Sequence, residues 1–115
     1  MQDELTYKLL KLIQKSPQLS QREMAEHLGI SLGKTNATIK SLIDKGLITI
    51  QEVIRQGPKV PFIYNLTPLG IRELPRIAAW YLAQKENQIK ELQQEVQEIR
   101  KMNETRESKG KNNRE

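Results

Sequence analysis

The chain has 115 residues, enough for one small domain and an additional segment but not for two full domains. Its formal net charge is +5, and residues 1–80 carry most of the excess, with 11 Lys and Arg against 7 Asp and Glu, which is consistent with an anionic partner. The absence of cysteine excludes disulfides, thiolate metal sites and a cysteine nucleophile.

The beginning of the chain predicts an amphipathic helix over residues 3–14. Its apolar stripe consists of Leu5, Leu9, Leu12 and Ile13. Tyr7 and Leu10 lie off this stripe, either as ordinary surface residues or covered by another helix. The first residues are acidic rather than basic, and no apolar run approaches the roughly 20 residues that cross a bilayer. We therefore expect a soluble, cytoplasmic protein that makes no membrane contact.

Residues 19–48 predict two short helices joined by a tight turn. Ser20 begins the first of them as part of an S-x-x-E capping box. Gly29 supplies the turn, Ser31 caps the second helix, and Gly46 ends it. This arrangement is a helix-turn-helix, in which the second helix enters the major groove of DNA.

The following segment predicts a β-hairpin. Residues 47–53 and 62–66 have strand character, and the IRQGPKVP sequence between them is typical of a loop. Thr67 and Pro68 then provide the cap and the first-turn proline of another helix. A helix-turn-helix followed by a hairpin with a basic tip is a winged helix. The predicted fold class is therefore mainly α with a small β-hairpin (α+β).

The order of these elements, and the segments DKGLI and YNLTPLG, resemble the MarR-type winged-helix transcription regulators over about residues 5–83. The segment GISLGKTNATIKSLIDKG, with the coiled-coil tail described below, is more closely similar to small regulators associated with exopolysaccharide gene clusters. This resemblance implies control of exopolysaccharide genes. The wing lacks the Asp-x-Arg pattern common in larger MarR proteins and the chain is shorter than theirs, so the sequence assigns no small-molecule effector.

The predicted second helix of the helix-turn-helix has an inward and an outward face. Its inward stripe consists of Thr35, Ile39, Leu42 and Ile43, with Leu32 beside it. Asn36, at the flank, is the best candidate for a base contact, because an amide can pair bidentately with adenine. Lys34 can reach guanine or phosphate, and Lys40 and Ser41 are better placed for phosphate.

The complete set of predicted DNA contacts comes from this helix, from the beginning of the preceding helix and from the wing tip. It consists of Ser20, Gln21, Arg22, Ser31, Gly33, Lys34, Asn36, Ala37, Lys40, Ser41, Arg55, Gln56 and Lys59. The alternative is a solvated helix face, and for the wing a flexible basic loop that makes no contact.

From residue 76 to about 104 the sequence predicts one long helix, preceded by a kink or restart at Pro75. Apolar residues recur at heptad spacing, and Glu95 and Arg100 fall at positions that attract between parallel strands. The predicted dimerisation residues are Tyr7, Leu10, Leu82, Ile89, Leu92, Val96 and Ile99. Ile77, Trp80 and Tyr81 are expected to pack near the first helix, in the same chain or in a partner. The alternative is a helix that packs on its own domain.

The resulting domain prediction is a winged helix-turn-helix at 1–74, a dimerisation helix at 75–104 and a disordered tail at 105–115. We expect a homodimer that binds double-stranded DNA at an inverted-repeat operator and regulates transcription. The alternative is a winged-helix adaptor whose coiled coil recruits a protein partner. His27 is the sole histidine, and no catalytic or phosphate-binding motif is present, so the sequence predicts no enzyme, cofactor or metal.

Overall fold

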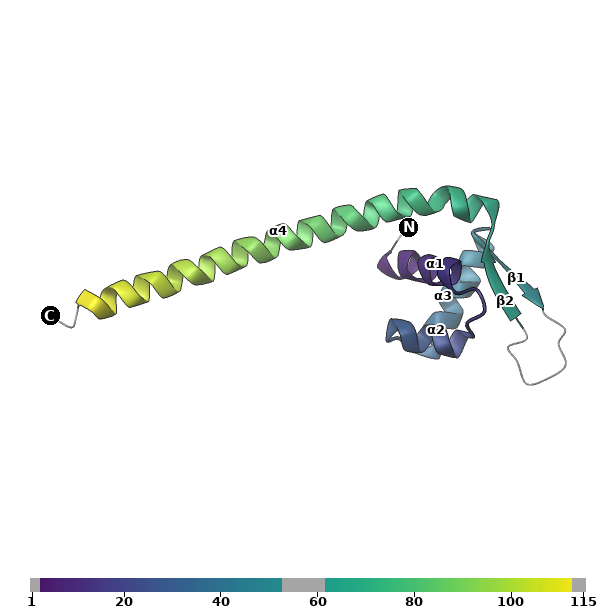
Figure 1. Cartoon of the computed structure of the whole chain (residues 1–115), viewed down its shortest axis with the longest axis horizontal. Coiled ribbons are helices and arrows are strands. Elements are labelled where there is room, and N and C mark those ends of the chain that lie inside the picture. The colour runs from purple at the N-terminus through teal and green to yellow at the C-terminus, as the bar shows by residue number, and fades with distance from the viewer. Residues whose placement is uncertain (1–2, 53–61, 113–115) are drawn as a thin grey trace. The chain divides into compact units, whose positions relative to one another are not determined.

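The structure, a computed structural model, describes residues 3–52 and 62–112, with side chains described to residue 106. The elements in chain order are α1 (Glu4–Lys15), α2 (Gln21–Leu28), α3 (Leu32–Asp44), β1 (Ile48–Glu52), β2 (Phe62–Leu66) and α4 (Pro68–Asn112). Figure 1 shows α1, α2 and α3 grouped together beside the β1–β2 hairpin. The predicted fold class is confirmed.

Polar caps determine where the first three helices begin. Asp3 precedes α1, and its Oδ1 accepts a hydrogen bond from the Thr6 amide at 2.7 Å. Ser20 begins α2 with the predicted capping box, and the Ser31 hydroxyl accepts from the Lys34 amide at 3.0 Å at the beginning of α3. These bonds satisfy backbone amides that have no partner within the helix, so each cap stabilises its helix by about 1 kcal/mol.

Two glycines in the left-handed region end the helices of the helix-turn-helix. Gly29, with φ of 66°, is the C-cap of α2, and Gly46, with φ of 75°, follows Lys45, the C-cap of α3. The described residues contain no other residue with positive φ. Both predicted turn positions are confirmed, because only glycine adopts this conformation without a steric cost.

The hydrophobic core lies between the three helices, the hairpin and the first turns of α4. The strands pair antiparallel, from Ile48 opposite Leu66 to Glu52 opposite Phe62. The core cluster consists of Leu9, Leu10, Ile13, Met24, Ile39, Leu42, Leu47, Ile48, Tyr64, Leu74 and Ile77. This core fixes α3 by its inward residues and leaves the opposite side of the helix exposed.

The beginning of α4 is joined to the turn after α3 by hydrogen bonds to one residue. The Thr67 hydroxyl donates to the Gly46 carbonyl and accepts from the Gly70 amide, as expected of the predicted cap. The Thr67 amide donates to the Leu47 carbonyl at 3.0 Å. Gly70 is buried against this carbonyl. The DKGLI and YNLTPLG segments are therefore neighbours in space.

One helix, α4, continues through Pro75 to Asn112, so of the two predicted outcomes, a kink or a restart, the restart does not occur. Because Pro75 has no amide hydrogen, the carbonyl of Ile71 lacks its usual helical hydrogen bond. Ile71 and Pro75 are both exposed, so water can reach the region around that carbonyl. The helix also extends past residue 104, where the sequence analysis placed the beginning of a disordered tail. Residues Met1–Tyr81 and Leu82–Glu115 form two compact units, and the predicted boundary, at residue 74, lies before that division.

Of the two residues that lay off the predicted stripe of the first helix, Leu10 is buried and Tyr7 is half-buried within the single chain. Leu10 is 0% exposed. Tyr7 stacks on Tyr81 of α4, with ring centroids 4.4 Å apart. The expectation that α4 residues pack near the first helix is confirmed for Tyr81, which contacts Tyr7 of the same chain. The assignment of Leu10 to a dimer interface must be corrected, because its side chain presents no surface to a partner.

Candidate DNA interface

The outward face of α3 carries small and cationic side chains. Gly33, Lys34, Ala37 and Lys40 are exposed, and Ser41 is half-buried. On the opposite side Thr35, Ile39 and Leu42 are buried and Ile43 is half-buried, as the helical projection predicted. A Cβ atom added at Gly33 would meet nothing within 4 Å, so this end of the face is open. A nucleic-acid backbone or base edge can therefore approach α3 closely.

Lys34 and Lys40 form no ion pair with any acidic side chain that the structure describes. The ion pairs among the described residues join Lys8 to Glu4 and Arg76 to Glu73, and neither involves α3. Both α3 lysines are exposed. Ammonium groups that are not neutralised by the protein itself are suited to phosphate contact, which dominates the affinity of proteins for DNA.

The N-terminal ends of α2 and α3 are both capped by serine, and the first turn of α2 also carries the Glu23 carboxylate of the capping box. The Ser20 and Ser31 hydroxyls accept hydrogen bonds from Glu23 and Lys34 amides, so their oxygens serve as caps. Arg22 is exposed in the first turn of α2. The positive end of the helix dipole and the remaining first-turn amides favour a phosphate at such a position.

A chain of side-chain hydrogen bonds connects α2, α3 and β2. The Asn36 Nδ2 donates to Gln21 Oε1 at 3.0 Å, and the Gln21 Nε2 donates to the Tyr64 hydroxyl at 3.1 Å. Asn36 and Gln21 are half-buried, and Tyr64 is 3% exposed. Sequence reasoning placed Gln21 and Asn36 on the DNA side but found neither bond nor Tyr64. A contact between residues 43 positions apart leaves no local pattern.

Leu32 differs from its predicted place beside the inward stripe, since it is 45% exposed. It is the first residue of α3, whereas the core packs against residues 35, 39 and 42 further along the helix.

His27 is exposed on α2. The predicted wing contacts Arg55, Gln56 and Lys59 lie outside the described residues.

No group of three His, Cys, Asp or Glu side chains in residues 3–52 and 62–112 is arranged to hold a metal ion. Among the same residues, no helix combines the length and apolarity that a membrane crossing requires.

The sequence comparison identifies the helix-turn-helix part of the chain. Residues 2–49 match the family model described as winged helix-turn-helix DNA-binding. No curated protein sequence matches the chain. The match covers α1, α2 and α3 and ends in β1.

Solved structures share the fold over a larger part of the chain. The S. aureus MepR–DNA complex has a TM-score of 0.65 and 20% identity, with 92% of this chain and 76% of MepR covered. A MarR/EmrR family transcriptional regulator from Acinetobacter sp. ADP1 has a TM-score of 0.58 and 20% identity, covering 75% of this chain. Streptococcus pneumoniae FabT in complex with DNA has a TM-score of 0.56 and 18% identity, covering 76%.

The chain spans 58% of the Acinetobacter protein and 59% of FabT. At these identities the comparisons establish the winged-helix fold found in MarR-family structures.

Proposed function

We propose that this protein is a transcription regulator that binds double-stranded DNA sequence-specifically as a homodimer. The observation that carries the proposal is the exposed face of α3, where two lysines with no acidic partner among the described residues flank the half-buried amide of Asn36. The family match to winged helix-turn-helix DNA-binding proteins and the fold shared with two DNA complexes support it.

In this proposal, different parts of the interface contact the bases and the phosphates. Asn36 reads a base edge in the major groove, and Gly33 and Ala37 let α3 approach the groove floor. Lys34 contacts guanine or phosphate. The beginnings of α2 and α3, with Lys40, Ser41 and the wing residues Arg55, Gln56 and Lys59, hold the DNA backbone. A steep dependence of affinity on salt concentration follows from such phosphate contacts.

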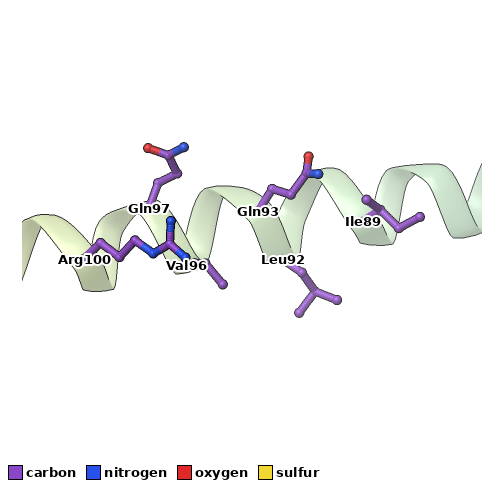
Figure 2. A pocket seen from close by; sticks show the side chains of 6 residues that line it. All are labelled: Ile89, Leu92, Gln93, Val96, Gln97 and Arg100. Atoms are coloured by element: carbon purple, nitrogen blue, oxygen red, sulfur yellow. The ribbon is translucent and has the colours of Figure 1, made fainter.

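Homodimerisation is proposed to occur through one face of α4, which we call the α4 seam. It consists of Leu82, Ile89, Leu92, Val96 and Ile99, and these side chains are 45% to 59% exposed. Figure 2 shows Leu92 and Val96 extending to one side of α4 and Gln93 and Gln97 to the other. Their spacing follows the a and d positions of a heptad repeat, so a second copy of α4 can bury the seam.

The residues around the seam favour two parallel strands in register. Ile89 and Val96 are β-branched at a positions, with Leu92 at d, a combination that favours two strands, whereas Ile99 at the following d position does not add to this preference. Glu95 at g lies opposite Arg100 at e of the other strand only when the strands are parallel. Asn103 occupies the next a position, where a polar side chain fixes the register.

Cross-linking of Asn103→Cys tests this orientation. Because the chain has no cysteine, a single thiol gives an unambiguous product. In a parallel dimer in register the two thiols lie within disulfide distance, so mild oxidation is expected to convert most of the protein to a covalent dimer on non-reducing gels. Cross-linking no greater than that of Gln94→Cys, on the outer face, contradicts the parallel arrangement.

The function is tested by fluorescence anisotropy with labelled duplexes. The duplexes are the gene's own upstream region and a random sequence of equal length, each titrated across a salt series. Preferential binding of the upstream region, with a steep salt slope for both duplexes, is expected. Weak binding without preference contradicts the proposal and favours a winged-helix adaptor that recruits another protein through the α4 seam.

Two substitutions on α3 separate base reading from phosphate contact. Asn36→Ala is expected to lower discrimination at one base pair by about 1–3 kcal/mol. Lys40→Ala is expected to weaken binding to all sequences alike and to reduce the salt slope by about 1. Both effects are measured by anisotropy on the preferred and the random duplex. An equal loss from both variants on every sequence would contradict this division.

A more specific part of the proposal concerns the genes that the protein regulates. The similarity of GISLGKTNATIKSLIDKG to small exopolysaccharide-associated regulators supports control of exopolysaccharide synthesis genes. Two-fold symmetry of a parallel dimer favours an inverted-repeat operator.

A further inference from the structure

We propose that Tyr64 and Gln21 are positioning residues that fix the amide of Asn36 for base reading. This inference rests on the proposed function, since it requires that Asn36 contact DNA. It assigns a role in sequence discrimination to a side chain of β2 that is 3% exposed and cannot itself touch a base.

Each member of the hydrogen-bond chain restrains the next. The Tyr64 amide donates to the Pro17 carbonyl at 3.1 Å, which ties β2 to the segment between α1 and α2. The Tyr64 hydroxyl then accepts from the Gln21 amide nitrogen, and the Gln21 oxygen accepts from Asn36. The Asn36 side chain is therefore held by the core of the domain and not only by its own rotamer preference.

The restraint determines which polar atoms Asn36 presents to a ligand. One N–H of its Nδ2 is used by Gln21, which leaves the second N–H as a donor and Oδ1 as an acceptor. Adenine offers a matching pair in the major groove, since its N7 accepts and its N6 donates. An Asn36 amide free to rotate by 180° would exchange donor and acceptor and would discriminate less between bases.

Gln21 therefore has a structural task in addition to any contact with the DNA backbone. Its amide bridges α2 and α3, so the two helices of the helix-turn-helix are coupled at the base-reading residue. The same amide links both helices to the wing through Tyr64. Loss of the Tyr64 hydroxyl loosens this restraint on Asn36 without removing any group that is proposed to contact DNA.

The test compares Tyr64→Phe with the wild-type protein. Each protein first selects sites from a duplex library that is randomised at its centre. Fluorescence anisotropy then measures the affinity of each protein for the enriched site and for its single-base substitutions. Tyr64→Phe keeps the buried ring and removes only the hydroxyl. We expect the preference for the enriched base read by Asn36 to fall at least about threefold, while affinity for random duplex stays unchanged. Tyr81→Phe is the matched control, since its hydroxyl contacts Glu4 and not Gln21.

A double-mutant cycle separates positioning from general stability. On an Asn36→Ala background, Tyr64→Phe is expected to cause no further loss of base preference, because it acts through Asn36. Gln21→Ala, which breaks the same chain outside the core, is expected to relax the same base position. Unchanged preference in Tyr64→Phe, or an equal loss with and without Asn36, overturns the inference. If the wild-type protein enriches no sequence from the library, the proposed function itself is overturned. That outcome is distinct from failure of the inference, in which the wild-type protein does select a site.

Discussion

Gly70→Ala is expected to destabilise the winged-helix unit by about 3 kcal/mol, the upper part of the range for overpacked sites. An alanine Cβ at this position would overlap the Leu47 carbonyl oxygen and lie 3.1 Å from its carbon. The obstacle is backbone, which cannot move aside like the end of a flexible side chain. The Thr67 bonds to Gly46 and Leu47 hold the two segments together, so relief of the clash would weaken them.

Thermal unfolding followed by circular dichroism measures this effect, and a fall in Tm of more than about 10 °C is expected for a domain of this size. Gly33→Ala is the matched control. Its Cβ would meet nothing within 4 Å on the exposed face of α3, so alanine should leave Tm unchanged or raise stability by up to about 1 kcal/mol. Similar Tm values for Gly70→Ala and Gly33→Ala would contradict the close approach of α4 to Leu47.

Gly70 belongs to the YNLTPLG segment, which is recognisable in the sequence although the structural role of its glycine is not. Gly29 and Gly46 could be predicted as turn residues because they end amphipathic helices, and both have positive φ. Gly70 lies within a helix, where glycine has no conformational advantage. Its reason is a contact with Leu47, which is 23 positions away in the chain, so no local pattern could reveal it.

The inward face of α3 and the beginnings of α2 and α3 were predictable because they depend on residues that are close together in the sequence. Capping residues and helical periodicity act within one or two turns, so the sequence contains both the signal and its cause. Ser20, Ser31 and Ile39 all lie as predicted. The exposed face of α3 follows directly from the buried one.

Interactions between distant segments could not be predicted from periodicity. Leu10 lies off the apolar stripe of α1, yet it is fully buried because the domain packs on more than one side of this helix. The bonds from Tyr64 to Gln21 and from Gln21 to Asn36 depend on how β2 and α2 approach each other. For the candidate site, the sequence therefore indicated which residues face outward but not how Asn36 is held.

Val96→Glu is expected to convert the proposed dimer to a monomer. Two glutamates at facing a positions would bury like charges without partners, at a cost of about 3–5 kcal/mol, which raises the dissociation constant at least about a hundredfold. Glutamate is a better helix former than valine, so α4 itself should persist. Sedimentation equilibrium or multi-angle light scattering at micromolar concentration measures the change.

Gln94→Glu is the matched control, because it adds the same charge to α4 at the heptad position farthest from the α4 seam. It should remain dimeric with unchanged helicity. In the proposed regulator, Val96→Glu should also lose most of its affinity for the inverted repeat but keep weak binding to a half-site, because α3 is unaltered. A wild-type monomer at micromolar concentration would contradict the proposed self-association. A dimer that survives Val96→Glu would exclude the α4 seam as its interface.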